Sequence, residues 1–211
     1  MENIIKTATI EPKASLFIQR IKQSTADLHV RLESQELLSA LMMPSVTSTQ
    51  YYYYLILMQH ILEVYEQEIV PELANTLNGF EQRKASQHIS DDLYNIGEST
   101  TNSLAKGYSI PSQKISIPFA LGFMYVMEGS KLGGKVIYKH IHRTLGYNEN
   151  SGAKFISDYG NNTFGFWKEF LFQSSAYITK NNLEEEAIQG AEFAFSSIYD
   201  FFESNRRVYE V

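Results

Sequence analysis

Apolar residues recur at helical spacing along most of this chain, and proline interrupts them at only five positions. Because proline ends or kinks a helix, the proline-free stretches can form long helices. No stretch shows the alternating pattern of a half-buried strand. A hydrophobic fraction of 44% over 211 residues is enough for one compact core. We therefore predict an all-α fold, with a single domain over residues 1–211 and its core at about 14–207.

Spacing and cap residues place the predicted helices. They cover residues 14–33, 34–43, 50–77, 80–96, 117–145, 163–179 and 183–207. Residues 97–113 are predicted to form a loop, because they are rich in Ser, Thr, Asn and Gly. The helix at 117–145 is unusual, since the letters GSKLGG at 129–134 are expected to interrupt it.

The composition excludes several classes of function. Cysteine is absent, which rules out disulfides, thiolate metal sites and a cysteine nucleophile. A formal net charge of −6 argues against general nucleic-acid binding, which needs a basic surface. The N-terminus lacks the apolar core of a signal peptide, and no apolar run approaches the roughly 18 residues of a membrane span. We expect a cytoplasmic protein that binds neither membranes nor nucleic acids.

The first candidate site is formed by Lys22, His29 and Glu33, at positions i, i+7 and i+11 of a predicted helix. This spacing places them on one stripe, so they can face one cavity. A neutral imidazole can bind heme iron, and a carboxylate one turn away can accept its free N–H. Lys22 lies about 10.5 Å back along the axis, within reach of a porphyrin carboxylate. The alternative is a helix whose charged face is only solvated.

The second candidate is the glycine-rich segment of the 117–145 helix. Gly122, Gly129 and Gly133 are again at i, i+7 and i+11. A glycine inside a helix costs about 0.5 to 1 kcal/mol relative to alanine, so this stripe needs a reason. It would let the backbone approach a flat ligand closely. Close packing against another helix is the alternative explanation.

A row of basic residues follows on the same helix, spaced by four. Its members are Lys131, Lys135, Lys139 and Arg143. In an acidic protein such a row could dock an acidic electron donor. The alternative is a solvated face whose cations complement the C-terminus of the helix.

His60, Glu63 and Glu66 have the helical spacing that a di-iron site in a bundle uses. Such a site needs matching ligands from other helices, and the 122–139 segment offers only Glu128. A dinuclear site is therefore the weaker hypothesis. No role is assigned to the remaining histidines, which are His88, His140 and His142.

Several stretches of the chain resemble one family. IKQSTADLHVRLE looks like the proximal helix of heme oxygenases, and LGFMYVMEGSKLGGKVI looks like the distal helix of their bacterial, biliverdin-producing branch. The resemblance continues through QHILEVYEQEI, WKEF and AIQGAEFAFSSIYDFF, and it spans about residues 18–202 in the same order. It implies a helical bundle that holds heme b between a proximal helix and a glycine-kinked distal helix.

The resemblance also implies roles for individual residues. His29 matches the iron ligand, Glu33 its hydrogen-bonding partner, and Lys22 and Lys168 match lysines that bind the heme propionates. Gly129 and Gly133, with Gly134 beside them, match the distal-helix backbone that lies over the porphyrin. The implied reaction uses O2 and electrons from an external ferredoxin, flavodoxin or reductase. It opens the heme ring to biliverdin, carbon monoxide and ferrous iron.

Two positions depart from the family pattern. Phe172 stands where a second basic residue is expected, which weakens the anchoring of the propionates. Ser130 replaces the distal aspartate of the mammalian type, although EGS is found in the bacterial branch; Ser130 is then the candidate to hold the catalytic water. These departures motivate the alternative of a heme-binding or heme-trafficking protein without turnover. A thiamin-degrading enzyme of the related fold is disfavoured because it needs a cysteine.

Overall fold

The computed structural model describes residues 10–80, 85–97, 106–111, 115–157 and 160–208. Regular structure in these ranges is helical, apart from isolated bridges at 148–152. The all-α prediction is confirmed. The α-helices are α1 (Pro12–Ser24), α2 (Ala26–Glu33), α3 (Glu36–Ala40), α4 (Ser48–Val64), α5 (Ser86–Ile96), α6 (Ile117–Leu145), α7 (Thr163–Asn181) and α8 (Glu184–Ser204).

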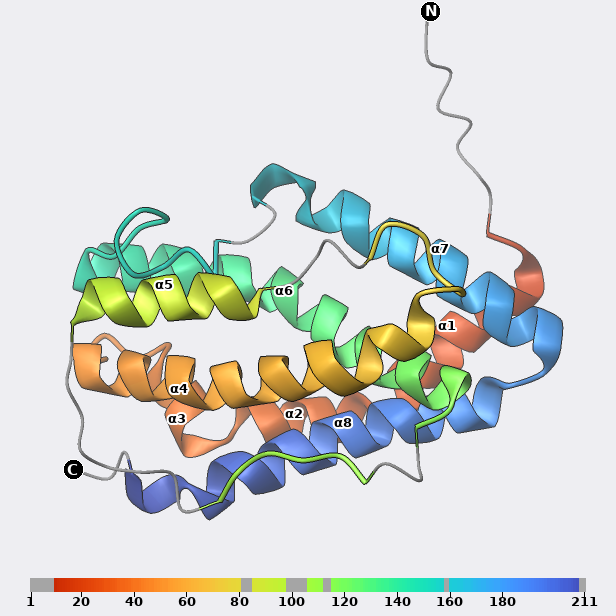
Figure 1. The fold of residues 1–211 in the computed structure, drawn as a ribbon, viewed down its shortest axis with the longest axis horizontal. Coiled ribbons are helices and arrows are strands. Elements are labelled where there is room, and N and C mark those ends of the chain that lie inside the picture. The colour runs from red at the N-terminus through yellow and green to blue at the C-terminus, as the bar shows by residue number, and fades with distance from the viewer. Residues whose placement is uncertain (1–9, 81–84, 98–105, 112–114, 158–159, 209–211) are drawn as a thin grey trace, which may run out of the picture.

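The helices pack as layers around α6, the longest of them (Figure 1). In that view α4 and α5 lie side by side in front, α8 runs along the bottom and α7 along the top. α6 contacts both α7 and α8, whereas α2 packs on α8 and α1 contacts α7. The chain thus places α2 and α6, which carry the two candidate sites, against a common neighbour, α8.

The predicted helix at 14–33 is divided in two at Thr25. The Thr25 hydroxyl donates a hydrogen bond of 2.8 Å to the carbonyl oxygen of Ile21, one turn back. Such back-bonding by a threonine competes with the regular helical pattern. α1 ends at Ser24 and α2 begins at Ala26. The prediction of one helix was wrong here, and Lys22 and His29 lie on successive helices.

The predicted helix at 50–77 is also shorter than expected. α4 ends at Val64, and a π-helical turn (Tyr65–Ile69) and a 3-10 turn (Pro71–Leu73) follow it. Pro71 has no backbone N–H to continue an α-helix. Within the predicted helix at 80–96, residues 81–84 lie outside the described ranges and α5 begins at Ser86. In the predicted loop, residues 98–105, 112 and 113 are likewise outside them.

α6 has the predicted bounds, Ile117–Leu145, and it continues through the glycine segment. The Ser116 hydroxyl caps its start by accepting the N–H of Phe119, and Gly146 ends it with a φ of 79°. Residues 129–134 therefore do not interrupt the helix, because a glycine that costs helix propensity is tolerated where the rest of the helix is well packed. A kink at these residues remains a prediction.

Candidate functional site

His29 projects from the middle of α2, and 54% of its side chain is exposed. Its Nδ1 lies 3.5 Å from a carboxylate oxygen of Glu33, one turn further along the helix. The ring of Phe195 on α8 meets the imidazole edge to face, with 5.5 Å between ring centroids. These two neighbours restrain the ring from different elements, and sequence reasoning identified only the first.

The other ring nitrogen of His29, Nε2, has no hydrogen-bond partner among the described residues. A neutral imidazole whose Nδ1–H faces a carboxylate keeps a lone pair on Nε2 for a metal. The exposure of the ring leaves room for an incoming ligand. The His29–Glu33 pair therefore has the chemistry of a metal-binding histidine with its orienting carboxylate.

The glycines of α6 serve different purposes. A Cβ atom added to Gly122 would come within 1.8 Å of the carbonyl oxygen of Ala187, so this glycine permits the close crossing of α6 and α8. A Cβ atom on Gly129 would lie 3.5 Å from the Trp167 ring, whereas one on Gly133 would meet nothing within 4 Å. The predicted stripe is thus not one surface, and helix packing accounts for Gly122.

The surface beside Gly133 suits a flat apolar ligand. One turn further along α6, Val136 is 58% exposed. The next residue, Gly134, lies close to the segment after α6, since a Cβ atom on Gly134 would be 3.4 Å from the carbonyl oxygen of Ile156. A stretch of backbone without side chains, next to an exposed apolar residue, matches what a porphyrin face requires.

Trp167, the only tryptophan, covers Gly129 from α7. It packs on Tyr125 of α6, with ring centroids 5.3 Å apart, and stacks on Phe170. Burial raises the pKa of the Tyr125 phenol above its ordinary value, because the low-dielectric surroundings disfavour the phenolate. Sequence reasoning did not predict this aromatic cluster. It considered Lys168 but not the neighbouring Trp167.

Ser130 is exposed, and its hydroxyl donates to the carbonyl oxygen of Met127 at 2.8 Å. Its oxygen can still accept a hydrogen bond from water. The neighbouring residues Glu128 and Lys131 form an ion pair of 2.8 Å in which the side chains are only 2% and 11% exposed. Two charges are therefore held inside the protein next to the glycine segment.

The lysines predicted to bind carboxylates lie on different helices. Lys22 is exposed near the end of α1. Lys168 is exposed on α7, with its ammonium nitrogen 4.5 Å from the centroid of the Phe164 ring. Phe172, one turn after Lys168, is 40% exposed.

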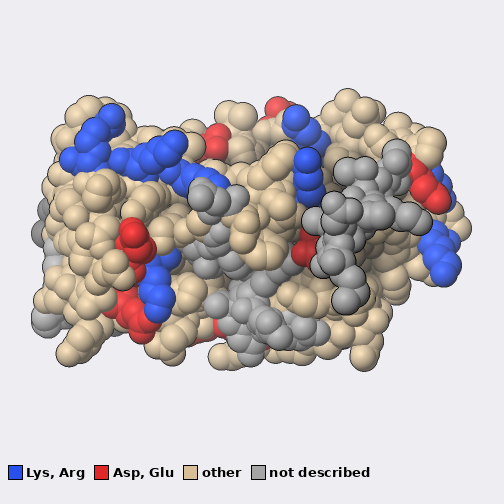
Figure 2. Space-filling model, turned by 90° about the horizontal axis from the view of Figure 1, so that it is seen from above, with Lys and Arg blue, Asp and Glu red and all other residues tan. Residues whose placement is uncertain are grey.

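The predicted basic row on α6 is shorter than expected. Lys131 is turned inward to Glu128, because a buried carboxylate on its own helix lies within reach. Lys139 and Arg143 are exposed and Lys135 is half-buried. Figure 2 shows Lys and Arg side chains gathered over the end of α6 that lies on the left in Figure 1. We call Lys135, Lys139 and Arg143 the basic ridge.

Two of the three residues proposed for a dinuclear site, Glu66 and His60, have other neighbours in the fold. Glu66 accepts the backbone N–H groups of Ala85 and Ser86 and the Ser86 hydroxyl, and so caps α5. The ring of His60 lies 6.4 Å from that of Phe201. Among the described residues, no three His, Asp or Glu side chains are grouped as metal ligands. This arrangement disfavours the dinuclear hypothesis.

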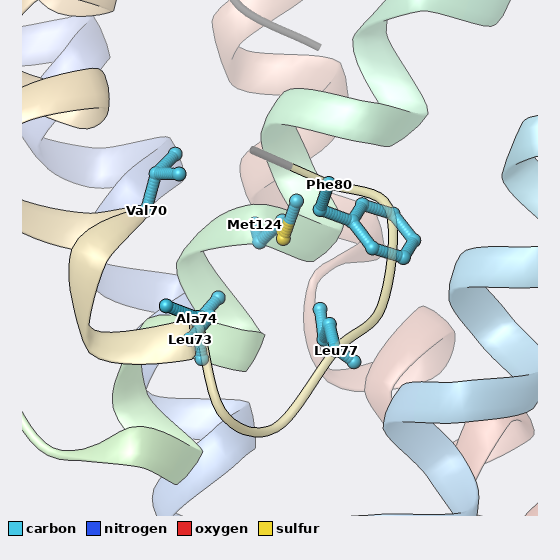
Figure 3. Close-up of a pocket in the computed structure, with 6 residues that line it drawn as sticks. All are labelled: Val70, Leu73, Ala74, Leu77, Phe80 and Met124. Atoms are coloured by element: carbon cyan, nitrogen blue, oxygen red, sulfur yellow. The ribbon is translucent and has the colours of Figure 1, made fainter. Parts of the chain in front are cut away.

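A separate apolar hollow lies between α6 and the segment that follows α4 (Figure 3). Its walls leave essentially no room even for a molecule the size of water, so it is not a small-molecule site in this structure. Its lining has no His, Asp or Glu side chain, and the thioether of Met124 is its one potential metal ligand. It therefore competes poorly with the site at His29. The lining residues are Val70, Leu73, Ala74, Leu77, Phe80 and Met124.

These observations define a class of protein. It is all-helical, with an oriented histidine on one helix and an exposed glycine backbone on another. The family model for heme oxygenase matches residues 15–204. The chain belongs to the heme oxygenase family. None of the helices in the described ranges combines the length and apolar composition needed to cross a membrane.

Individual relatives agree with this assignment. Heme oxygenase PigA of Pseudomonas aeruginosa is 28% identical over 204 residues, which cover 92% of this chain and 97% of that protein. The solved NO- and CO-bound heme oxygenase of Neisseria meningitidis is 25% identical, with a TM-score of 0.73 over 90% of this chain and 92% of its own. Heme oxygenase of Leptospira interrogans shares the fold, with 16% identity and a TM-score of 0.72 over 88% of this chain and 98% of its own.

Proposed function

We propose that this chain is a heme oxygenase that uses O2 and electrons from an external donor to open the ring of heme b, giving biliverdin, carbon monoxide and ferrous iron. The observation that carries the proposal is His29, whose Nδ1 faces Glu33 and whose Nε2 is left for a metal. Family membership and the bare backbone at Gly133 support it. The whole chain acts as one domain in this proposal.

Bound heme supplies the iron that activates O2 and is also the molecule that is oxidised. His29 binds that iron as a neutral imidazole, and Glu33 holds the ring in the required tautomer. On the opposite face, Gly133 and Gly134 would leave the α6 backbone free of side chains for the porphyrin to approach, whereas at Gly129 the Trp167 ring already covers the Cβ side, so Gly129 would contribute only through its main chain. Lys22 and Lys168 bind the propionates through charge-assisted hydrogen bonds.

Ser130 is proposed to hold water beside the site. Because its own proton goes to Met127, its oxygen is an acceptor, and the water bound there keeps a proton to pass on. Neither Glu128 nor Lys131 takes this role in the proposal, since each neutralises the other in a buried pair. Electrons come from outside, and the basic ridge is the proposed docking surface for an acidic ferredoxin, flavodoxin or reductase.

A heme-binding protein without turnover is the second candidate, and Ser130 and Phe172 are the observations that favour it. One experiment separates the two. The purified protein is titrated with hemin, and ascorbate is then added in air while the Soret band and bile-pigment absorption are followed. We expect an equimolar complex whose Soret band decays as pigment forms. A Soret band that persists would identify the non-catalytic protein.

The site assignment has its own control. His29→Ala is expected to lose the spectrum of histidine-bound heme and the turnover, and added imidazole should restore the spectrum by taking the place of the missing side chain. His142→Ala is the matched variant, because His142 is also exposed but lies on α6 and bonds to the carbonyl oxygen of Tyr147 just after that helix. It should bind heme as the wild type does. Normal turnover by His29→Ala contradicts the assignment.

A further inference from the structure

His140, to which the sequence assigned no role, joins α6 to a segment almost a hundred residues earlier. The side chain is 6% exposed, and its Nε2 lies 2.9 Å from the carbonyl oxygen of Met43. Its Nδ1 lies 3.1 Å from Arg143. Arginine can only donate, so Nδ1 accepts and Nε2 carries the proton. His140 is therefore a neutral imidazole that donates to Met43.

The Met43 carbonyl is fixed with respect to α2. It belongs to the turn after α3, and α3 follows α2 directly in the chain. Leu37 and Leu41 hold that unit in the core, with exposures of 1% and 0%. The side chain of Gln35, which caps α3, also donates to Glu203 of α8 at 3.2 Å. A bond to this turn is thus a bond to the unit that carries His29.

The glycine segment lies between two attachment points of α6. At one end Gly122 allows the close crossing with α8, and at the other His140 holds Met43. Between these two residues the helix rises about 27 Å at 1.5 Å per residue. Moving the His140 end would therefore move the backbone at Gly133 relative to His29.

From this geometry we infer that His140 is a positioning residue, which sets how far the glycine segment stands from the proximal imidazole. The inference rests on the proposed function, since it concerns the gap in which the heme is held. Arg143 has a supporting role, because its donation to Nδ1 keeps the proton on Nε2. A buried histidine that only satisfies the Met43 carbonyl would affect stability alone, whereas a positioning residue also affects how heme is held.

The test measures how fast heme leaves the protein, by transfer to excess apomyoglobin, and the C–O stretching frequency of the ferrous carbonyl complex. His140→Ala removes the bond, and we expect heme to dissociate about tenfold faster, as the loss of one good hydrogen bond predicts. The carbonyl frequency should shift, because the distal backbone is displaced. His140→Gln can donate to Met43 and accept from Arg143, so it should stay within about twofold of the wild type.

His142→Ala, two residues along the same helix, is the control and should change neither quantity. The inference is overturned if His140→Ala keeps the wild-type dissociation rate and frequency, even with a lower melting temperature. If His140→Ala does not fold, His140→Leu decides, because it fills the space but donates no hydrogen bond to Met43. Faster dissociation supports the inference and an unchanged rate overturns it. A wild-type protein that takes up no heme overturns the proposed function itself, and the inference then falls with it.

Discussion

Two neighbours restrain the His29 ring, Glu33 on its own helix and Phe195 on α8. Glu33 follows four residues later on the same helix, so helical geometry alone places it beside the imidazole. Phe195 is more than 160 residues away, on the apolar face of α8. Periodicity shows that this face is buried, but it does not show which of its residues meets His29. Short-range pairs follow from spacing, whereas long-range pairs need the packed structure.

The contribution of Glu33 can be measured directly. Glu33→Ala removes the carboxylate that faces His29 Nδ1, so the imidazole loses its orienting partner and part of its basicity. We expect heme affinity to fall by about 10- to 100-fold, the usual effect of removing such a partner. Hemin titration followed at the Soret band checks this.

Glu36→Ala is the matched control for that substitution. Glu36 is a similarly exposed glutamate at the start of α3, and its partner is Arg206 rather than a histidine. Exposed ion pairs of this kind contribute little to stability. The control should bind heme normally. Equal affinity of the two variants would show that Glu33 does not act on His29.

At the scale of the helix, α6 shows why the glycine pattern was ambiguous. Gly122 and Gly133 occupy the same stripe by spacing, yet one lies against the backbone of α8 and the other faces open space. The reciprocal glycine on α8 is Gly190, where a Cβ atom would come within 2.2 Å of the carbonyl oxygen of Phe119. Spacing along a helix predicts which side of the helix a residue faces, but it does not show which neighbouring element lies on that side.

Alanine substitutions should separate these two glycines. Gly122→Ala places a methyl group against backbone atoms that cannot move aside, so we expect a loss of about 3 kcal/mol or more in the free energy of unfolding. Gly133→Ala should instead stabilise the heme-free protein by up to about 1 kcal/mol, because alanine has the higher helix propensity. Urea unfolding of the heme-free variants measures both changes.

Heme binding gives the second half of this prediction. The methyl group of Gly133→Ala would stand where the porphyrin is proposed to lie, so this variant should bind heme more weakly although it is more stable. A Gly133→Ala protein with both higher stability and unchanged heme affinity would show that the ligand does not lie against Gly133. The proposed distal surface would then be wrong.

Over the whole molecule, the features that could be predicted are those that local chemistry decides. The all-α class and the bounds of α6 follow from periodicity, proline placement and caps. The basic row could not be predicted in full. Lys131 turns inward because Glu128 is buried beside it, and the sequence does not show that Glu128 is buried. Likewise, His140 became informative only when the fold brought it to Met43.

The uneven distribution of charge in an acidic molecule leads to a test of the basic ridge. Lys139→Glu reverses one exposed charge near the C-terminal end of α6, and Lys180→Glu makes the same change in net charge near the C-terminal end of α7. With an acidic ferredoxin as donor, Lys139→Glu should lower the turnover rate severalfold at low salt, and added salt should shrink the difference, because screening weakens steering between exposed charges.

Lys180→Glu should match the wild type, and with ascorbate as reductant all three proteins should turn over alike. If Lys139→Glu is equally slow with ascorbate, the substitution has damaged the heme site, and if both variants slow equally with ferredoxin, net charge rather than the ridge governs donor binding.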